Sequence, residues 1–405
     1  MRSTAGLEWP ATLDIAGLME DGWRPTPFRE FIVKIHSRCD LACDYCYMYE
    51  MADQSWRDRP RSMTYEIAKH AALRIGEHAR HHRLRDISVI LHGGEPLLAG
   101  PQLMSYLVTA VRDEAGSEVT VDASVQTNAV GLDDSYLRLF SDLGVTVGVS
   151  LDGAENAHNR HRRFRSGRGS HAAVTAALHR LAKPQYRHLF NGLLCTIDLR
   201  NDPITTYEAL LDFQPPKIDF LLPHGTWAVP PAGRVPGSRD TPYADWLITI
   251  FDYWYPAART RIRLFEEIMS LLLGGSSSSE MVGLSPSTLI VIETDGSLEQ
   301  GDVLKAAYHG APATGLHVIQ DRLDDALLLP GVAARQLGKR ALSAECRACR
   351  IHRVCGGGFY AHRYRPGSGF ANPSVYCPDL MRLIDHIRSV VQADINRHLA
   401  RQEII

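Results

Sequence analysis

The sequence predicts an α/β fold, a partial (β/α)6 barrel followed by a cysteine-rich domain. Two observations predict it. Short apolar runs alternate with helical patterns from residue 31 to about residue 225, and seven of the eight cysteines fall into two groups, one toward each end of the chain. A repeated strand and helix order builds a parallel sheet, and about six units form a partial barrel rather than a closed one of eight strands. The chemistry of such barrels lies at the carboxyl ends of the strands.

The expected elements alternate regularly along the barrel region. The strand candidates are the apolar runs 31–35, 87–91, 119–125, 145–149, 193–197 and 218–222. Between them, apolar residues recur at helical spacing in patterns that start near residues 63, 103, 137, 174 and 207. Gly144 is a stop signal for the third helix, and Ser170 is the candidate N-cap of the fourth.

Composition limits the classes of protein that this chain can be. A length of 405 residues exceeds what one core usually supports, so a large domain with a smaller one appended is expected. A net charge of -2 gives no reason to expect a nucleic-acid partner, and no apolar run approaches the roughly 18 to 20 residues of a membrane helix. The first 30 residues lack the pattern of a signal peptide, so we expect no export. In a chain without a secretion signal, cysteines are more often metal ligands than partners in disulfide bonds, so we expect a location in the reducing cytoplasm.

The alternation ends near residue 225, and we expect five segments. They are an N-terminal extension over 1–28, the barrel over 29–225, a helical bridge over 226–290, the cysteine-rich domain over 291–385 and a C-terminal helix over 386–405. Residues 274–279 of the bridge are all glycine or serine, which predicts either a flexible tip or a lid.

The first cysteine group is Cys39, Cys43 and Cys46, directly after the first strand candidate. Three thiolates on one short loop can hold three irons of a [4Fe-4S] cluster and leave the fourth iron open to a small molecule. Zinc would need a second pair of ligands nearby, and no such cysteine pair lies within the next hundred residues. The sequence therefore predicts a cluster with one open iron.

This spacing resembles the signature of radical S-adenosylmethionine (radical SAM) enzymes, in which the open iron chelates the amino and carboxylate groups of the cofactor's methionine part. The resemblance implies that Tyr45, just before the third cysteine, contacts the adenine. It also implies that Arg162 pairs with the cofactor's carboxylate. Arg162 lies in a basic run, 158–168, for which a solvated loop is the ordinary explanation, and the run lacks the interleaved aromatics of a nucleic-acid site.

Further cofactor candidates follow the ends of three predicted strands. They are Gly93, Gly94 and Glu95 after the second strand, Gln126 and Asn128 after the third, and Ser150 and Asp152 after the fourth. The Gly-Gly-Glu-Pro segment resembles the motif that receives the amino group of S-adenosylmethionine. The polar side chains can bond ribose hydroxyls and the carboxylate. The alternative for Asn128 and Ser150 is to cap the next helix or to shape a turn.

The second cysteine group has the spacing Cys346-x2-Cys349-x5-Cys355, with Cys377 further on. Four cysteines satisfy a closed site, either for zinc or for a second [4Fe-4S] cluster. The remaining cysteine, Cys195, is expected to be a small core residue.

The spacing resembles the SPASM extension of radical enzymes that modify peptides, in which further cysteines hold a second auxiliary cluster. This chain departs from that pattern at two positions, because Gly301 and Phe359 stand where the family has cysteines. Both departures affect the same cluster. The resemblance therefore implies two [4Fe-4S] clusters in this chain and not three.

From about residue 29 to 385, the chain resembles the FxsB-type radical SAM/SPASM peptide maturases. The motifs that carry this resemblance are L-L-P-H-G-T-W, E-T-D-G-S-L-E-Q and G-G-G-F-Y-A-H-R-Y-R-P-G-S-G-F-A-N-P-S-V-Y-C. It implies that the chain joins an aromatic carbon to a β-carbon in a ribosomally made precursor peptide, forming a three-residue cyclophane. A reductant such as flavodoxin or ferredoxin is implied as a partner.

The same resemblance assigns the role of proton acceptor to Asp302, which ends a segment similar to the family's D-G-x-x-x-P-C-D, although a turn-capping role is the alternative. The C-terminal cluster either relays an electron or is structural. Two rival functions stay open. One is another radical oxidation of a peptide, such as formylglycine formation or a thioether link, and the other is a non-catalytic iron-sulfur or zinc module.

Overall fold

A computed structural model describes residues 8–402, and its strands form one ten-stranded sheet. The strands are β1 Glu30–His36, β2 Asp86–Gly93, β3 Thr120–Thr127, β4 Val145–Ser150, β5 Phe190–Thr196, β6 Lys217–Leu221, β7 Arg261–Ile262, β8 Leu289–Ile292, β9 Ser297–Glu299 and β10 Ala313–His317. Their order in the sheet is β10-β9-β8-β1-β2-β3-β4-β5-β6-β7.

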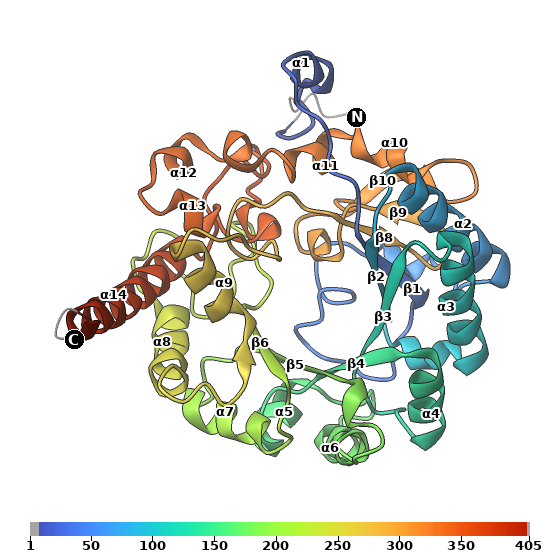
Figure 1. Cartoon of the computed structure of the whole chain (residues 1–405), viewed down its shortest axis with the longest axis horizontal. Coiled ribbons are helices and arrows are strands. Elements are labelled where there is room, and N and C mark those ends of the chain that lie inside the picture. Colours follow the sequence, from blue (N-terminus) through green and yellow to red (C-terminus); the bar gives the residue numbers. More distant parts are fainter. Residues whose placement is uncertain (1–7, 403–405) are drawn as a thin grey trace.

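The helices of the barrel region lie outside this sheet. The α-helices are α1 Ile15–Glu20, α2 Tyr65–His81, α3 Pro101–Ala115, α4 Asp134–Leu143, α5 Glu155–His161, α6 His171–Leu181, α7 Pro203–Leu211, α8 Pro242–Trp254, α9 Arg263–Leu272, α10 Leu323–Leu327, α11 Pro330–Ala334, α12 Ala344–Ala348, α13 His352–Cys355 and α14 Cys377–Gln402. Figure 1 shows the sheet curving around the middle of the molecule, with α2 to α7 on its outer side.

The six expected strands are present as β1 to β6, and they pair in parallel in chain order. Their apolar side chains, such as Val33 of β1 and Leu91 of β2, are fully buried. The partial (β/α) barrel is therefore confirmed. Its carboxyl ends carry the loops that contain the predicted cofactor residues.

The sheet continues beyond the barrel at both edges. At one edge β7 pairs in parallel with β6. At the other, β8 pairs in parallel with β1 and carries the antiparallel strands β9 and β10. The cysteine-rich part of the chain is thus joined to the first barrel strand by backbone hydrogen bonds.

Local signals account for several helix ends. The Thr64 hydroxyl accepts a hydrogen bond from the backbone N–H of Ile67 and caps α2, and α4 ends at Gly144 in a left-handed conformation (φ 60°). Ser170 precedes α6 as expected, but its side chain does not cap the helix. Its hydroxyl donates to the carbonyl of Arg162 at 2.8 Å, so it fixes the loop that carries Arg162.

The C-terminal helix α14 begins at Cys377, so the segment limit expected at residue 385 lies inside this helix. The division into five segments otherwise stays a prediction. Within residues 8–402, no helix combines the length and the apolar character needed to cross a bilayer.

Candidate active site

The three-cysteine loop leaves the end of β1 and is held against the end of β2. The backbone N–H of Gly94 donates to the carbonyl of His36 at 2.8 Å, and that of Glu95 donates to the carbonyl of Arg38 at 3.0 Å. A Cβ on Gly94 would lie 1.9 Å from the Tyr49 hydroxyl oxygen. The glycines therefore let two backbones approach each other, which positions the cysteine loop.

Cys39, Cys43 and Cys46 carry free thiols that line one cavity. Burial raises the pKa of all three thiols, that of Cys46 to about 11, so they are protonated unless a metal displaces the protons. Within residues 8–402, no three of their sulfur atoms lie within 4.8 Å of one another. As these side chains stand, they are too widely spaced to share one tetrahedral zinc ion with bonds of about 2.3 Å to each thiolate.

The cavity has a volume of about 670 Å³ and brings together most of the predicted residues. Its lining includes Cys39, Cys43, Cys46, Tyr45, Gly93, Gly94, Glu95, Gln126, Asn128, Ser150, Arg162, Gly301, Asp302 and Phe359. Of the predicted site residues of the barrel, Asp152 alone does not line it. The cavity thus extends from the cysteine loop to the region of Asp302.

Asp152 lies behind Tyr45 and forms a buried chain with it and Arg162. The Tyr45 hydroxyl donates to Asp152 Oδ2 at 2.5 Å and accepts from Arg162 Nη1 at 2.9 Å. Burial raises the pKa of Asp152 against the opposing effect of Arg162. Arg162 is close enough to Cys43 to act against the burial that raises that thiol's pKa. Its Nε has no hydrogen-bond partner among the described residues, so the guanidinium can still bind a carboxylate.

The Glu95 carboxylate already has partners within the protein. It accepts hydrogen bonds from the Thr127 hydroxyl at 2.7 Å and from the backbone N–H groups of Leu97 at 3.0 Å and Asn128 at 2.8 Å. Burial raises its pKa to about 7. Glu95 therefore braces the ends of β2 and β3, a contribution that the sequence analysis did not assign to it.

The amide and hydroxyl groups that follow β3 and β4 have local partners as well. Gln126 Nε2 donates to the Ser150 hydroxyl at 3.1 Å, and Asn128 Oδ1 accepts from the backbone N–H of Val130 at 2.8 Å. The Asn128 bond is the turn-shaping role weighed from the sequence. Asn128 Nδ2 also lies 3.5 Å from Cys39 Sγ. Contact of these residues with a cofactor stays a prediction.

Asp302 begins a 3-10 helix over Asp302–Ala306, and its carboxylate is buried at the far end of the cavity. Lys34 Nζ lies 2.7 Å from Asp302 Oδ1 and 3.3 Å from Glu293, and the Tyr47 hydroxyl donates to Asp302 Oδ2 at 3.2 Å. Lys34 was not predicted from the sequence to contribute to the site. Its signal was a charged residue inside an apolar strand run.

Three further histidines of the cavity wall were also missed. His92, His224 and His362 each keep a buried ring nitrogen without a hydrogen-bond partner in residues 8–402. Burial lowers the pKa of all three, that of His224 to about 4, so their rings are neutral. His92 Nδ1 lies 4.0 Å from Asp302 Oδ2, and the Phe359 ring packs against the other two imidazoles.

The serine segment predicted as a flexible tip or a lid also lies on this cavity. Ser278 and Ser279 donate from their hydroxyls to the Glu267 carboxylate at 2.7 and 2.5 Å. The segment is thereby tied to α9 and forms part of the cavity wall.

The second cysteine group lines a separate cavity of about 320 Å³. Cys346, Cys349, Cys355 and Cys377 all contribute to it. Burial raises the pKa of Cys355 to about 11 and that of Cys377 to about 12. Four thiols on one cavity can hold either zinc or a second [4Fe-4S] cluster, the two alternatives that the sequence leaves open. Cys195 is buried in β5 and lines neither cavity, as expected for a core residue.

The barrel region matches a family model, and most of the chain is similar to known proteins. Residues 33–199 match the family model described as the radical SAM superfamily. The chain is 24% identical over 375 residues to the cysteine-type anaerobic sulfatase-maturating enzyme of Clostridium perfringens, with 89% of this chain and 96% of the relative covered. It is 26% identical over 352 residues to the serine-type enzyme of Klebsiella aerogenes, with 85% and 82% covered.

Solved structures share the fold. Native anSMEcpe with bound AdoMet (S-adenosylmethionine) matches with a TM-score of 0.77 at 22% identity, covering 91% of this chain and 99% of that one. Streptococcus suis SuiB bound to its precursor peptide SuiA matches with a TM-score of 0.56 at 14% identity, covering 89% and 78%. The resemblance to FxsB-type cyclophane-forming enzymes stays a prediction.

Proposed function

We propose that this chain, whose residues 33–199 form a radical SAM domain, matures a peptide or protein substrate by oxidising a cysteine or serine side chain to formylglycine. One observation carries the proposal. A single cavity brings three convergent thiols together with Arg162 and Asp302, in a chain that is similar over most of its length to sulfatase-maturating enzymes. The similarity to sulfatase-maturating enzymes indicates the class of substrate.

Separate groups of residues would hold the cofactors. Cys39, Cys43 and Cys46 would hold a [4Fe-4S] cluster, and Tyr45 and Arg162 would hold S-adenosylmethionine beside it. When bound and reduced, these groups supply a 5'-deoxyadenosyl radical that can remove a hydrogen atom from a side-chain carbon. Flavodoxin or ferredoxin is the proposed reductant. The four C-terminal cysteines would hold the second cluster of a SPASM-like domain.

The residues around Asp302 would accept the proton that the substrate loses. Oxidation of a side chain by two electrons removes two hydrogens, so after the first hydrogen atom has left to the 5'-deoxyadenosyl radical, one electron and one proton must follow. The four C-terminal cysteines would hold a cluster that can take the electron. A cysteine substrate, oxidised to the thioaldehyde, would then take up water and release hydrogen sulfide. Lys34 pairs with the Asp302 carboxylate at 2.7 Å, and the Tyr47 hydroxyl donates a hydrogen bond to it at the cavity wall. Asp302 would accept the proton, and neutral His92, 4.0 Å away, is the next group that could take it.

Formation of a carbon-carbon crosslink is the second candidate. The motifs shared with FxsB-type enzymes favour it, and two of their residues, His224 and Phe359, form an aromatic wall of the cavity. An aromatic side chain of a peptide could pack against this wall. The bond would join an arene carbon to a β-carbon with the loss of two hydrogens.

Mass spectrometry together with carbonyl trapping separates the two candidates. The enzyme is reconstituted anaerobically and incubated with S-adenosylmethionine, reduced flavodoxin and peptides that differ only in cysteine, serine or alanine at one position. Formylglycine formation predicts a hydrazide-reactive product that has lost two hydrogens from serine, or two hydrogens with replacement of sulfur by oxygen from cysteine. A crosslink also loses two hydrogens but gives no carbonyl. Cofactor cleavage without either product from these peptides, or from the precursor encoded beside the enzyme, would contradict both.

A further inference from the structure

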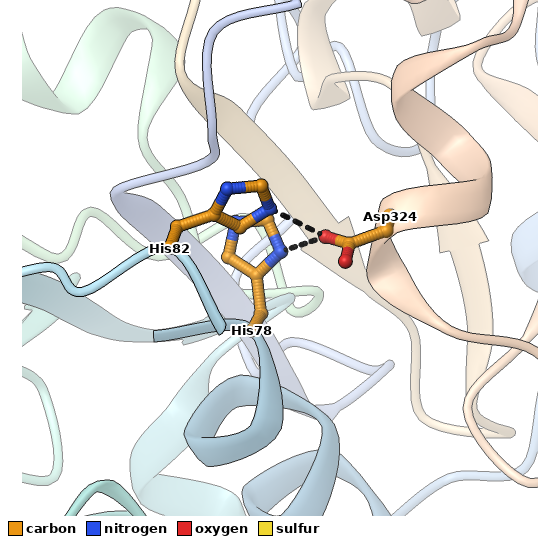
Figure 2. A group of neighbouring side chains, drawn as sticks. All are labelled: His78, His82 and Asp324. Carbon is orange, nitrogen blue, oxygen red and sulfur yellow. Dashed lines mark hydrogen bonds and ion pairs between the residues drawn. The ribbon is translucent and has the colours of Figure 1, made fainter. Parts of the chain in front are cut away.

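A cluster of histidines and one aspartate joins the barrel to the C-terminal part of the chain, away from both cysteine sites. His78 and His82 lie one turn apart at the end of α2, and Asp324 comes from α10. Figure 2 shows both imidazole rings directed at the same carboxylate. His78 Nδ1 lies 2.5 Å and His82 Nε2 lies 2.9 Å from Asp324 Oδ1. None of the three residues lines either cavity described above.

The arrangement has the donor set of a transition-metal site. One atom from each residue, two imidazole nitrogens and a carboxylate oxygen, all lie within 4.8 Å of one another. In residues 8–402 this is the one such group of three, and it contains no thiol. Imidazole and carboxylate ligands suit zinc and similar divalent ions, and two histidines four residues apart on a helix can bind one ion from the same face.

Hydrogen bonds within the cluster leave some of its polar atoms without a close partner. Both rings approach the same oxygen, whereas Asp324 Oδ2 has no partner nearer than Nε2 of His81 and Nη2 of Arg322, each at 3.9 Å. The His78 side chain is 1% exposed, and its Nε2 has no hydrogen-bond partner in the described part of the chain. If the proton of His78 resides on Nε2, its Nδ1 lone pair points at the cluster, as a metal ligand requires.

The charges around the cluster leave room for a cation. Arg322 pairs with Glu77 at 3.0 Å, and Arg74 pairs with the same carboxylate at 2.9 Å. Glu77 offsets one of these two guanidiniums and Asp324 the other, so the four side chains carry no net charge that would repel a cation. The exposed His81 stands beside Asp324 and could supply a fourth ligand, with water as the alternative.

We propose that His78, His82 and Asp324 bind one divalent transition-metal ion of the zinc class, which clamps α2 of the barrel to α10. Polar contacts already join these two parts of the chain, since Arg74 donates to the carbonyls of Val318 at 3.0 Å and Ile319 at 3.2 Å. A metal at the end of this interface would fix the segment after β10 on the barrel. The site needs neither iron-sulfur cluster, so the proposal is independent of the proposed function.

The test uses the reconstituted full-length enzyme, dialysed free of loosely bound metal and titrated with Zn²⁺. We expect one zinc per chain that survives gel filtration, measured by elemental analysis beside the iron, and a rise of a few degrees in Tm. His82→Gln and Asp324→Asn should each weaken zinc binding roughly tenfold or more and abolish the rise in Tm. His70→Gln, on the same helix but outside the cluster, is the matched control and should behave as the wild type.

Two results would overturn the proposal. One is a wild-type enzyme that retains no zinc and shows no change in Tm on titration. The other is zinc retention by both cluster variants at the level of the His70→Gln control, which would mark adventitious binding elsewhere. Circular dichroism and iron content of each variant show whether it has folded, and because two ligands are tested separately, one misfolded variant leaves the other to decide.

Discussion

Lys34 lies at 0% exposure near the end of β1, with its ammonium between the carboxylates of Asp302 and Glu293. A buried ammonium is costly unless it is paired, and its removal from water is offset here by two acidic partners. The pairing has a chemical consequence. A carboxylate that these contacts hold at the wall of a cavity is positioned to accept a proton from a substrate.

Replacing Asp302 by asparagine tests the role of this carboxylate. We expect Asp302→Asn to cleave S-adenosylmethionine but to form product roughly 100-fold more slowly, because general base catalysis contributes about that much. The measurements are 5'-deoxyadenosine and modified peptide in the same assay. Glu299→Gln is the control, because Glu299 lies in the same buried charge cluster, pairing with Lys305 at 2.9 Å, but does not line the cavity. Product formation at the wild-type rate by a folded Asp302→Asn enzyme would assign the proton to His92 or to solvent.

A second residue-scale prediction concerns the Tyr45 hydroxyl. Tyr45→Phe removes the atom that joins Asp152 to Arg162 and leaves two buried charged groups without that partner. Hydrogen bonds to charged groups contribute about 1.5–3 kcal/mol, so we expect the Kd for S-adenosylmethionine to rise roughly tenfold or more, measured by equilibrium binding to the reconstituted enzyme. Tyr47→Phe is the matched control, because its hydroxyl contacts Asp302 instead. Equal affinity of the two variants for S-adenosylmethionine would show that the contact between Tyr45 and Arg162 does not contribute to cofactor binding.

The cysteine loop and the end of β2 act as one structural element. Gly94→Ala would place a Cβ 2.6 Å from the backbone of Arg38 and still closer to Tyr49, so the loop must move. We expect a loss of stability of roughly 1–3 kcal/mol and poor assembly of the first cluster, seen as lower iron content and slower cofactor cleavage. Gly131→Ala is the control, since its Cβ would meet Leu97 only at an ordinary 3.8 Å. Normal iron content in Gly94→Ala would show that the loop tolerates the shift.

The strands of the barrel were predictable because each is a local apolar run between turn signals. The extensions of the sheet were not. β8 is four residues long and pairs with β1, which lies more than 250 residues earlier in the chain, and β7 has only two residues. Short strands with distant partners leave no periodic signal. The contacts of the serine segment were not predictable for a related reason, because its hydrogen bonds go to Glu267, a residue on α9.

The site was predictable where spacing along the chain carries the chemistry. The cysteine loop, Tyr45 and Arg162 meet at one cavity as expected. The role of Glu95 was harder to predict, because two of its three hydrogen-bond donors, Thr127 and Asn128, lie at the end of β3 and only the fold brings them to Glu95. Lys34 and the group of His78, His82 and Asp324 depend on residues that are distant in sequence for the same reason.

At the scale of the whole molecule, the side chains around Gly301 and Phe359 bear on the predicted number of clusters. Arg335 fills the space beside Gly301, since a Cβ on Gly301 would lie 3.0 Å from the guanidinium. Arg335 is paired there with Glu280, and its charge holds the pKa of Glu280 below the usual value despite burial. On the other side, Phe359 packs against His224 and His362. An ion pair and three rings thus occupy the region in which the related pattern places a further cluster.

Anaerobic reconstitution should therefore give about eight irons per chain, two cubes of four. Replacing Cys346 and Cys349 by alanine should remove about half of this iron and leave cofactor cleavage intact, because that step needs only the cluster of Cys39, Cys43 and Cys46. Replacing these three instead should remove the other half and abolish 5'-deoxyadenosine formation. Cys195→Ala is the control and should change neither value, because its thiol is buried in β5. A reproducible count near twelve would mean that Arg335 and Phe359 move aside for a third cluster, with ligands other than the cysteines of this sequence pattern.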